Sequence, residues 1–182
     1  TNIIRMKGQK MDGSIQVYYG NGRGKTTAAL GLGIRAAGVG KQVIMVQFLK
    51  KKHSDTLDFL KKLEPELQIF RFEKAACGYS DLSPKEKQEQ MLNIKNALGY
   101  SRKVLDTGQC DLLILDEIFG LVDYNIITIE ELMDLIAVKK DSMDLILTGR
   151  NLPDEVREIA DCVYSIQREK EKTPEILAQG NF

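Results

Sequence analysis

A short glycine-rich stretch near the N-terminus carries the residue types that bind phosphate. Gly20, Gly22 and Gly24 stand at alternate positions, and Lys25-Thr26-Thr27 follows them directly. Glycine lets the backbone turn sharply and bring its N–H groups close to a ligand, and a helix start adds unpaired N–H donors with partial positive charge. A lysine on the phosphate oxygens and a threonine hydroxyl on Mg²⁺ complete such a site. We therefore predict that this loop binds a nucleotide.

The loop differs from the usual phosphate loop by one residue. The general pattern places its first glycine five positions before the last one, where this chain has Tyr19, and here that glycine comes one step later. A variant loop allows a different number of bound phosphates or a different nucleotide orientation. The alternative, a glycine-rich turn with an incidental lysine, explains neither the threonine pair nor the helix predicted behind it.

A pair of acids follows a strongly apolar run. Residues 112–115 are all Leu or Ile, and Asp116 and Glu117 come next. A buried strand of this kind would deliver a fixed carboxylate to the edge of the phosphate site, where it would hold Mg²⁺ directly or through water. The alternative for Glu117 is an acid that simply favours the start of a helix.

Arg150 ends another predicted strand, directly after Thr148 and Gly149. A guanidinium at this place would bind phosphate or ribose with two parallel hydrogen bonds. An ion pair with Asp154 or Glu155 explains the same pattern equally well.

The hydrophobic pattern predicts strands alternating with helices, and hence an α/β fold. Such an alternation favours a mostly parallel sheet of about six strands with helices on both faces, and ligands of such sheets bind at the carboxyl ends of the strands. We expect strands at 15–19, 43–48, 67–72, 112–115, 145–147 and 162–166, and helices at 25–37, 55–63, 83–105, 118–124, 129–136 and 153–160.

Composition narrows the class of protein. With 182 residues and a formal net charge of zero, we expect one domain at 14–182 after a flexible segment at 1–13, and no nucleic-acid or membrane partner. No apolar run approaches the roughly 20 residues needed to span a bilayer. Cys77, Cys110 and Cys162 are widely spaced, which favours reduced cytoplasmic thiols, mostly in the core, over disulfides or zinc ligands. A Ser-His-Asp triad would need the lone histidine, His53, which we expect in a solvated loop.

Several segments resemble the corrinoid adenosyltransferases of the ATP:cob(I)alamin type. The resemblance covers roughly residues 14–167, and the compressed glycine loop is the family's own form. The matching segments are GNGRGKTTAA (20–29), GVGKQV (38–43), VQFLK (46–50), LDE (115–117), LTGRNLP (147–153) and AD (160–161).

This resemblance implies a fold, a reaction and partners. The fold would be a RecA-like P-loop domain, commonly a homodimer. The reaction would transfer the 5′-deoxyadenosyl group of ATP to Co(I) of a reduced corrinoid and release triphosphate, in cobalamin synthesis or salvage. Mg²⁺ or Mn²⁺ would assist, and a flavoprotein would supply electrons in the cytoplasm.

The resemblance also implies roles for particular residues. Thr26 and Glu117 would be metal ligands, Lys25 would act in catalysis, and Tyr79 would be the aromatic residue that helps to remove the lower axial ligand of cobalt. ATP would be bound by Gly20, Asn21, Gly22, Arg23, Gly24, Lys25, Thr26, Thr27 and Arg150.

Two departures from the family pattern lie in its corrinoid half. Asp81 stands where the family has a tryptophan, and residues 169–174 replace a stretch resembling Lys-His-Pro-Phe. Two alternative functions stay open at this point: a P-loop ATPase or kinase, and a nucleotide-dependent corrinoid-binding module without turnover.

Overall fold

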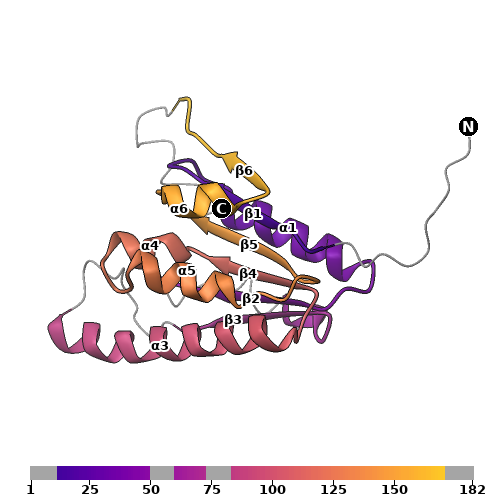
Figure 1. Cartoon of the computed structure of the whole chain (residues 1–182), viewed down its shortest axis with the longest axis horizontal. Coiled ribbons are helices and arrows are strands. Elements are labelled where there is room, and N and C mark those ends of the chain that lie inside the picture. The colour runs from indigo at the N-terminus through magenta and orange to yellow at the C-terminus, as the bar shows by residue number, and fades with distance from the viewer. Residues whose placement is uncertain (1–11, 50–59, 73–82, 171–182) are drawn as a thin grey trace, which may run out of the picture.

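One parallel sheet forms the centre of the molecule. A computed structural model describes residues 12–49, 60–72 and 83–170, and the six strands within these ranges are ordered β3-β2-β4-β5-β1-β6 (Figure 1). Every neighbouring pair is parallel. The strands are β1 (Ile15–Tyr19), β2 (Val43–Gln47), β3 (Leu67–Arg71), β4 (Leu112–Asp116), β5 (Asp144–Gly149) and β6 (Cys162–Ser165).

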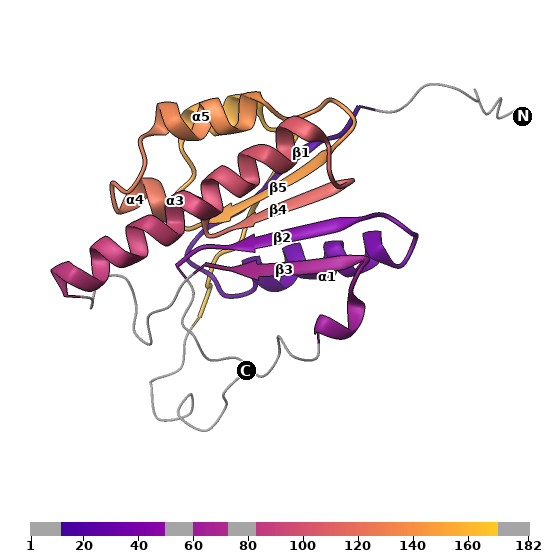
Figure 2. The same ribbon diagram turned by 90° about the horizontal axis from the view of Figure 1, so that it is seen from below.

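Helices cover both faces of this sheet, as Figure 1 and Figure 2 show together. Helix α1 lies on one face, and α3, α4 and α5 lie on the other. The helices are α1 (Lys25–Ala37), α3 (Pro84–Thr107), α4 (Ile118–Asp123), α5 (Ile129–Ala137) and α6 (Asp154–Ile159), with a 3-10 helix η1 (Lys61–Leu63).

Strand β4 shows why the central strands are apolar throughout. Leu113 and Leu115 pack with the helices α3, α4 and α5, whereas Leu112 and Ile114 pack beneath α1. Successive side chains of a strand point to opposite faces, so a strand covered on both sides needs an apolar residue at every position. Asp116, the last residue of β4, is as deeply buried as the leucines before it, and it needs polar partners inside the protein.

The structure confirms the predicted α/β class and nearly all predicted elements. Each described strand and helix begins and ends within one or two residues of its expected position. Most of the helix expected at 55–63 lies outside the described residues, and its described end becomes η1. Residues 1–11, within the predicted lead-in, lie outside them as well. No helix in the described ranges is long and apolar enough to cross a bilayer.

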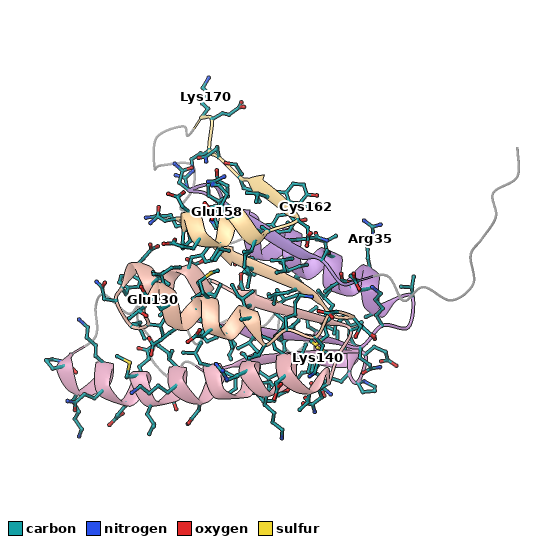
Figure 3. The ribbon with its side chains drawn as sticks, viewed as in Figure 1. Arg35, Glu130, Lys140, Glu158, Cys162 and Lys170 are labelled. Carbon is teal, nitrogen blue, oxygen red and sulfur yellow. The ribbon has the colours of Figure 1, made fainter. Side chains whose placement is uncertain are left out.

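The cysteine prediction is only partly right. Cys110 is buried, and burial raises the pKa of its thiol to about 12. Cys162, labelled in Figure 3, is exposed on the edge strand β6, so the prediction of core packing is wrong for this residue. An edge strand has one open side, which leaves such a position accessible to solvent. Cys77 lies outside the described residues.

A substitution at Gly149 would test how closely helix α4 packs against the sheet. A Cβ added at Gly149 would lie 2.5 Å from Cβ of the buried Phe119. We expect Gly149→Ala to lower the free energy of unfolding by about 1–3 kcal/mol, the usual cost of overpacking. Gly31→Ala is the matched control, because no atom lies within 4 Å of the added Cβ, and this helical change should stabilise by about 0.5–1 kcal/mol. Urea denaturation measures both, and equal effects would contradict this packing.

Candidate functional site

Three chain segments meet at the carboxyl edge of β1, β4 and β5. Tyr19 pairs with Gly149, and Leu115 pairs with Leu147, which brings Asp116 beside Thr148. The loop after β1 is also bonded to the end of β5, since the N–H of Gly20 donates to the carbonyls of Gly149 and Arg150 at 3.2 and 3.0 Å. The three polar motifs of the sequence therefore lie at one edge, as predicted for a ligand site in a parallel sheet.

The glycine loop is held by the segment that follows β6. The N–H of Gly22 donates to the Ile166 carbonyl at 2.9 Å, and the N–H of Arg168 donates to Oδ1 of Asn21 at 3.3 Å. A Cβ would lie 2.3 Å from that Ile166 oxygen at Gly20 and 2.8 Å from it at Gly22. These two glycines are therefore required by close backbone contact with residue 166, in addition to any ligand.

Gly24 has a different reason to be glycine. Its φ of 108° is rarely adopted by residues with a side chain, and no atom lies within 4 Å of an added Cβ. It stands at the N-cap of α1, where no side chain of the described residues caps the helix. The N-terminus of a helix carries N–H donors and partial positive charge, so this position suits an anion.

Lys25 lies inside the loop. Its Nζ donates to the carbonyls of Gly20 at 2.7 Å and of Gly22 at 2.9 Å. The positive charge is therefore held at the centre of the glycine turn and next to the α1 N-terminus, as a phosphate site requires.

Tyr19 explains why the glycines begin one position late. It is still paired in the sheet, with Gly149 on one side and Ser165 on the other. Hydrogen bonds from Arg157 and with Ser165 hold the pKa of its phenol below the ordinary value, and the Arg157 guanidinium lies 5.2 Å from the ring centroid. The position that is glycine in the general loop is thus a strand residue here.

Asp116 is the buried hydrogen-bond acceptor beneath the loop. It receives the Thr26 hydroxyl at 2.9 and 3.1 Å, the Gln47 amide at 3.0 Å and the Thr148 hydroxyl at 2.7 Å. Gln47 in turn accepts from Nε of Arg71 at 2.6 Å. Both carboxylate oxygens of Asp116 are therefore engaged within the protein, as a fully buried carboxylate requires.

Glu117 is the acid that faces a cavity. Its φ is 62°, a left-handed conformation that is costly for a residue with a side chain and typical of functional sites. Its N–H donates to Oγ1 of Thr148 at 2.8 Å. A Cβ added at Gly120 would lie 2.7 Å from Cδ1 of Leu49 but at an ordinary contact distance of 3.5 Å from Oε1 of Glu117, so glycine at this position is required by Leu49. Although Glu117 occupies the N-cap position of α4, its side chain does not cap that helix.

Two cavities flank the loop and share one wall. The smaller, of about 420 Å³, is lined by Lys25 and Glu117, and the larger, of about 750 Å³, is lined by Tyr19 and Arg168. Asn21, Arg150 and Asn151 line both. Lys25, Glu117 and Arg150, from three different segments, therefore border one space that is large enough for a polyphosphate with a metal ion.

The predicted site residues divide into three groups. Gly20, Asn21, Lys25, Glu117 and Arg150 border these cavities, and Thr26 lies just beneath them on Asp116. Four loop residues line neither cavity: Arg23, Gly24 and Thr27 are exposed, and Gly22 is buried against Ile166. Tyr79 lies outside the described residues.

The ion pair considered for Arg150 is absent from the described part of the chain. Asp154 instead lies 4.0 Å from Arg157, and Glu155 makes no ion pair with Arg150 there either. Arg150 lines both cavities, which supports the ligand-binding interpretation.

Several residues of this edge had no role assigned from the sequence. Asn151, Gln167 and Arg168 line the larger cavity, and Gln47 and Thr148 bind Asp116. A polar residue at the end of an apolar strand was the available signal for the last two. Gln167 and Arg168 carried no such signal, because only the fold brings them to the loop.

A divalent cation fits the donors at this edge. Within the described residues, no group of three or more His, Cys, Asp or Glu side chains could hold a metal ion. Mg²⁺ is usually bound by one or two carboxylates together with substrate phosphates. Glu117 and the Thr26 hydroxyl are suitable protein ligands for that arrangement.

Comparisons with known proteins point to one family. A family model described as ATP:corrinoid adenosyltransferase BtuR/CobO/CobP matches residues 11–179. The chain is 30% identical over 155 residues to a corrinoid adenosyltransferase of Escherichia coli K12, covering 85% of this chain and 76% of that protein. It is also 30% identical over 159 residues to the corrinoid adenosyltransferase CobA of Salmonella typhimurium, covering 87% and 79%.

A solved structure is similar in fold. The crystal structure of a KaiC-like protein from Pyrococcus horikoshii matches with a TM-score of 0.57 and 20% identity, covering 89% of this chain and 75% of that one. This likeness concerns the fold alone, and it confirms the predicted RecA-like arrangement.

A substitution at Gly22 would test the contact between the glycine loop and residue 166. We expect Gly22→Ala to displace the loop from the Ile166 carbonyl and to lower ATP affinity at least about tenfold, or about 1.4 kcal/mol. Isothermal titration calorimetry with ATP measures the change. Gly38→Ala is the control, because Gly38 has helical φ and the nearest atom to an added Cβ is 3.4 Å away. Unchanged affinity in Gly22→Ala would show that this contact does not shape the site.

Proposed function

The chain belongs to the ATP:corrinoid adenosyltransferase family, and from this membership we propose how its glycine-loop edge carries out the transfer. The enzyme transfers the 5′-deoxyadenosyl group of ATP to Co(I) of a reduced corrinoid. The observation that carries the proposal is the convergence of Lys25, Glu117 and Arg150 on one cavity.

The main task of the protein in this reaction is to stabilise the leaving group, triphosphate. Co(I) supplies both electrons of the new cobalt–carbon bond, and the bond between C5′ and its oxygen breaks as triphosphate departs. The nucleophile comes with the substrate, so the protein acts by alignment and by stabilising the departing charge. No proton has to be removed from the corrinoid for this step.

Lys25 and the α1 N-terminus stabilise the triphosphate. The ammonium already lies among the loop carbonyls of Gly20 and Gly22, so it needs little reorganisation to meet phosphate oxygens. The N–H groups behind Gly24 add donors of fixed direction. The remaining loop residues, Asn21, Arg23 and Thr27, complete the ATP contacts in this proposal.

The remaining positive charge on the triphosphate would come from a metal ion held by Glu117 and Thr26, and from Arg150. Glu117 and the Thr26 hydroxyl would hold Mg²⁺ or Mn²⁺, which supplies positive charge to the triphosphate when it is bound. Arg150 lies in the shared wall of the two cavities, and its guanidinium would form two parallel hydrogen bonds with ATP.

Tyr79 and the remaining features form the second part of the proposal. Tyr79 would act on the corrinoid by helping to remove the lower axial ligand of cobalt, which makes Co(I) easier to form. The enzyme would work as a cytoplasmic homodimer with a flavoprotein electron donor, and residues 14–182 would form its single domain.

Replacement of Lys25 is the first test of the proposed function. Lys25→Ala should abolish turnover, because the ammonium at the centre of the loop is lost. Anaerobic spectra with ATP, Mg²⁺ and cob(I)alamin report the cobalt–carbon bond, and chromatography reports triphosphate. Lys140→Ala is the control, since Lys140 is exposed and pairs only loosely with Asp106 at 3.8 Å. Near-normal activity in Lys25→Ala would contradict the proposal.

Replacement of Tyr79 tests its proposed role on the corrinoid. We expect Tyr79→Ala to keep ATP affinity within about twofold while slowing cobalt reduction or transfer at least about tenfold, the size expected when a group acts only in the chemical step. Stopped-flow spectra of the bound corrinoid, together with ATP titrations, separate the two effects. An unchanged transfer rate would remove Tyr79 from the site.

A further inference from the structure

Thr148 joins the two consecutive acids through a single hydroxyl group. Its Oγ1 donates to Oδ1 of Asp116 at 2.7 Å and accepts the backbone N–H of Glu117 at 2.8 Å. Thr148 is fully buried at the end of β5, and neither bond involves a residue of the glycine loop. The role assigned above to the site does not use this residue.

We propose that Thr148 is the positioning residue that makes Glu117, rather than Asp116, the metal ligand. It keeps Asp116 turned into the protein and holds the peptide of Glu117 in the conformation that directs its side chain to the cavity. This inference rests on the proposed metal role of Glu117.

The direction of both hydrogen bonds is fixed by chemistry. A carboxylate can only accept, so the Thr148 hydrogen points to Asp116 and an oxygen lone pair is left for the N–H of Glu117. Water cannot easily replace the hydroxyl, because the side chain is buried. Removal of the hydroxyl therefore takes away the acceptor that Thr148 provides for the N–H of Glu117 and leaves the buried Asp116 with one donor fewer.

The held conformation is one that Glu117 would not adopt readily by itself. Its φ of 62° is left-handed, and such a conformation persists where surrounding contacts determine it. Thr148 supplies the hydrogen bond on one side of this turn. Phe119, packed directly over Gly149, limits movement of the following residues on the other.

The carboxylate of Asp116 also orients Thr26, the second proposed metal ligand. Thr26 donates to Asp116 directly, whereas Glu117 is connected to it through Thr148. One buried acid thus orients a hydroxyl from α1 and a carboxylate from the start of α4. Partners of this kind commonly change metal affinity by about ten- to a hundredfold when they are removed.

Thr148→Val is the test, because it keeps the shape and removes the hydroxyl. The full-length protein is titrated with Mn²⁺ in the presence of ATP and followed by electron paramagnetic resonance, and ATP binding is measured separately in EDTA. We expect Mn²⁺ affinity to fall at least about tenfold and metal-free ATP affinity to change less than about threefold. Thr148→Ser should restore Mn²⁺ affinity to within about threefold of the unchanged protein.

Two controls separate positioning from loss of structure. Ser101→Ala removes another fully buried hydroxyl, one that donates to the Ala97 carbonyl at 2.8 Å within α3, and it should leave Mn²⁺ affinity unchanged. In a Glu117→Gln background, Thr148→Val should add less than about threefold, because residues acting as one unit are not additive. Thr148→Ala replaces Thr148→Val if the valine variant does not fold.

The outcomes distinguish this inference from the proposed function. Full Mn²⁺ affinity in Thr148→Val, or a loss that adds completely to that of Glu117→Gln, would overturn the positioning role. If Glu117→Gln itself binds Mn²⁺-ATP normally, the metal role of Glu117 in the proposed function fails instead. A fall in Thr148→Val that is rescued by serine and absent in Glu117→Gln supports both.

Discussion

The buried carboxylate of Asp116 organises the nucleotide edge of this protein. A charge without solvent must be satisfied internally, and Asp116 accepts hydrogen bonds from Thr26 on α1, Gln47 on β2 and Thr148 on β5. These bonds fix three elements relative to β4 at the place where the strands end. Asp116 is engaged by these bonds, whereas its neighbour Glu117 lines the cavity and is connected to the same network through Thr148. Glu117 is therefore the acid that we propose as the metal ligand.

The glycine loop depends on a second constraint, close contact with the chain after β6. Gly20 and Gly22 leave no space for a side chain against the Ile166 carbonyl, and only Gly24 faces open space. A phosphate loop is usually explained by its ligand alone. Here two of three glycines also serve an internal contact, so the loop is shaped by the fold before any nucleotide binds.

The sequence predicted the elements better than the roles of the residues at the site. Continuous apolar runs such as residues 112–115 mark strands covered on both faces, and this pattern located the sheet and the edge that carries the loop. The pattern cannot tell which of two adjacent acids turns inward, since that depends on Thr148 and Gln47 from other strands. It also cannot bring Arg168 to Asn21, a contact across 147 positions of the chain.

The balance of products tests most directly whether this edge transfers the adenosyl group or hydrolyses ATP. The unaltered protein would be incubated anaerobically with ATP, Mg²⁺ and cob(I)alamin, and the cobalt–carbon product and the phosphorus products would be counted together. We predict one triphosphate for each adenosylated corrinoid, because the proposed site in the cavity lined by Lys25 and Glu117 would retain the three phosphates as one leaving group. ADP and phosphate without a cobalt–carbon bond would contradict it.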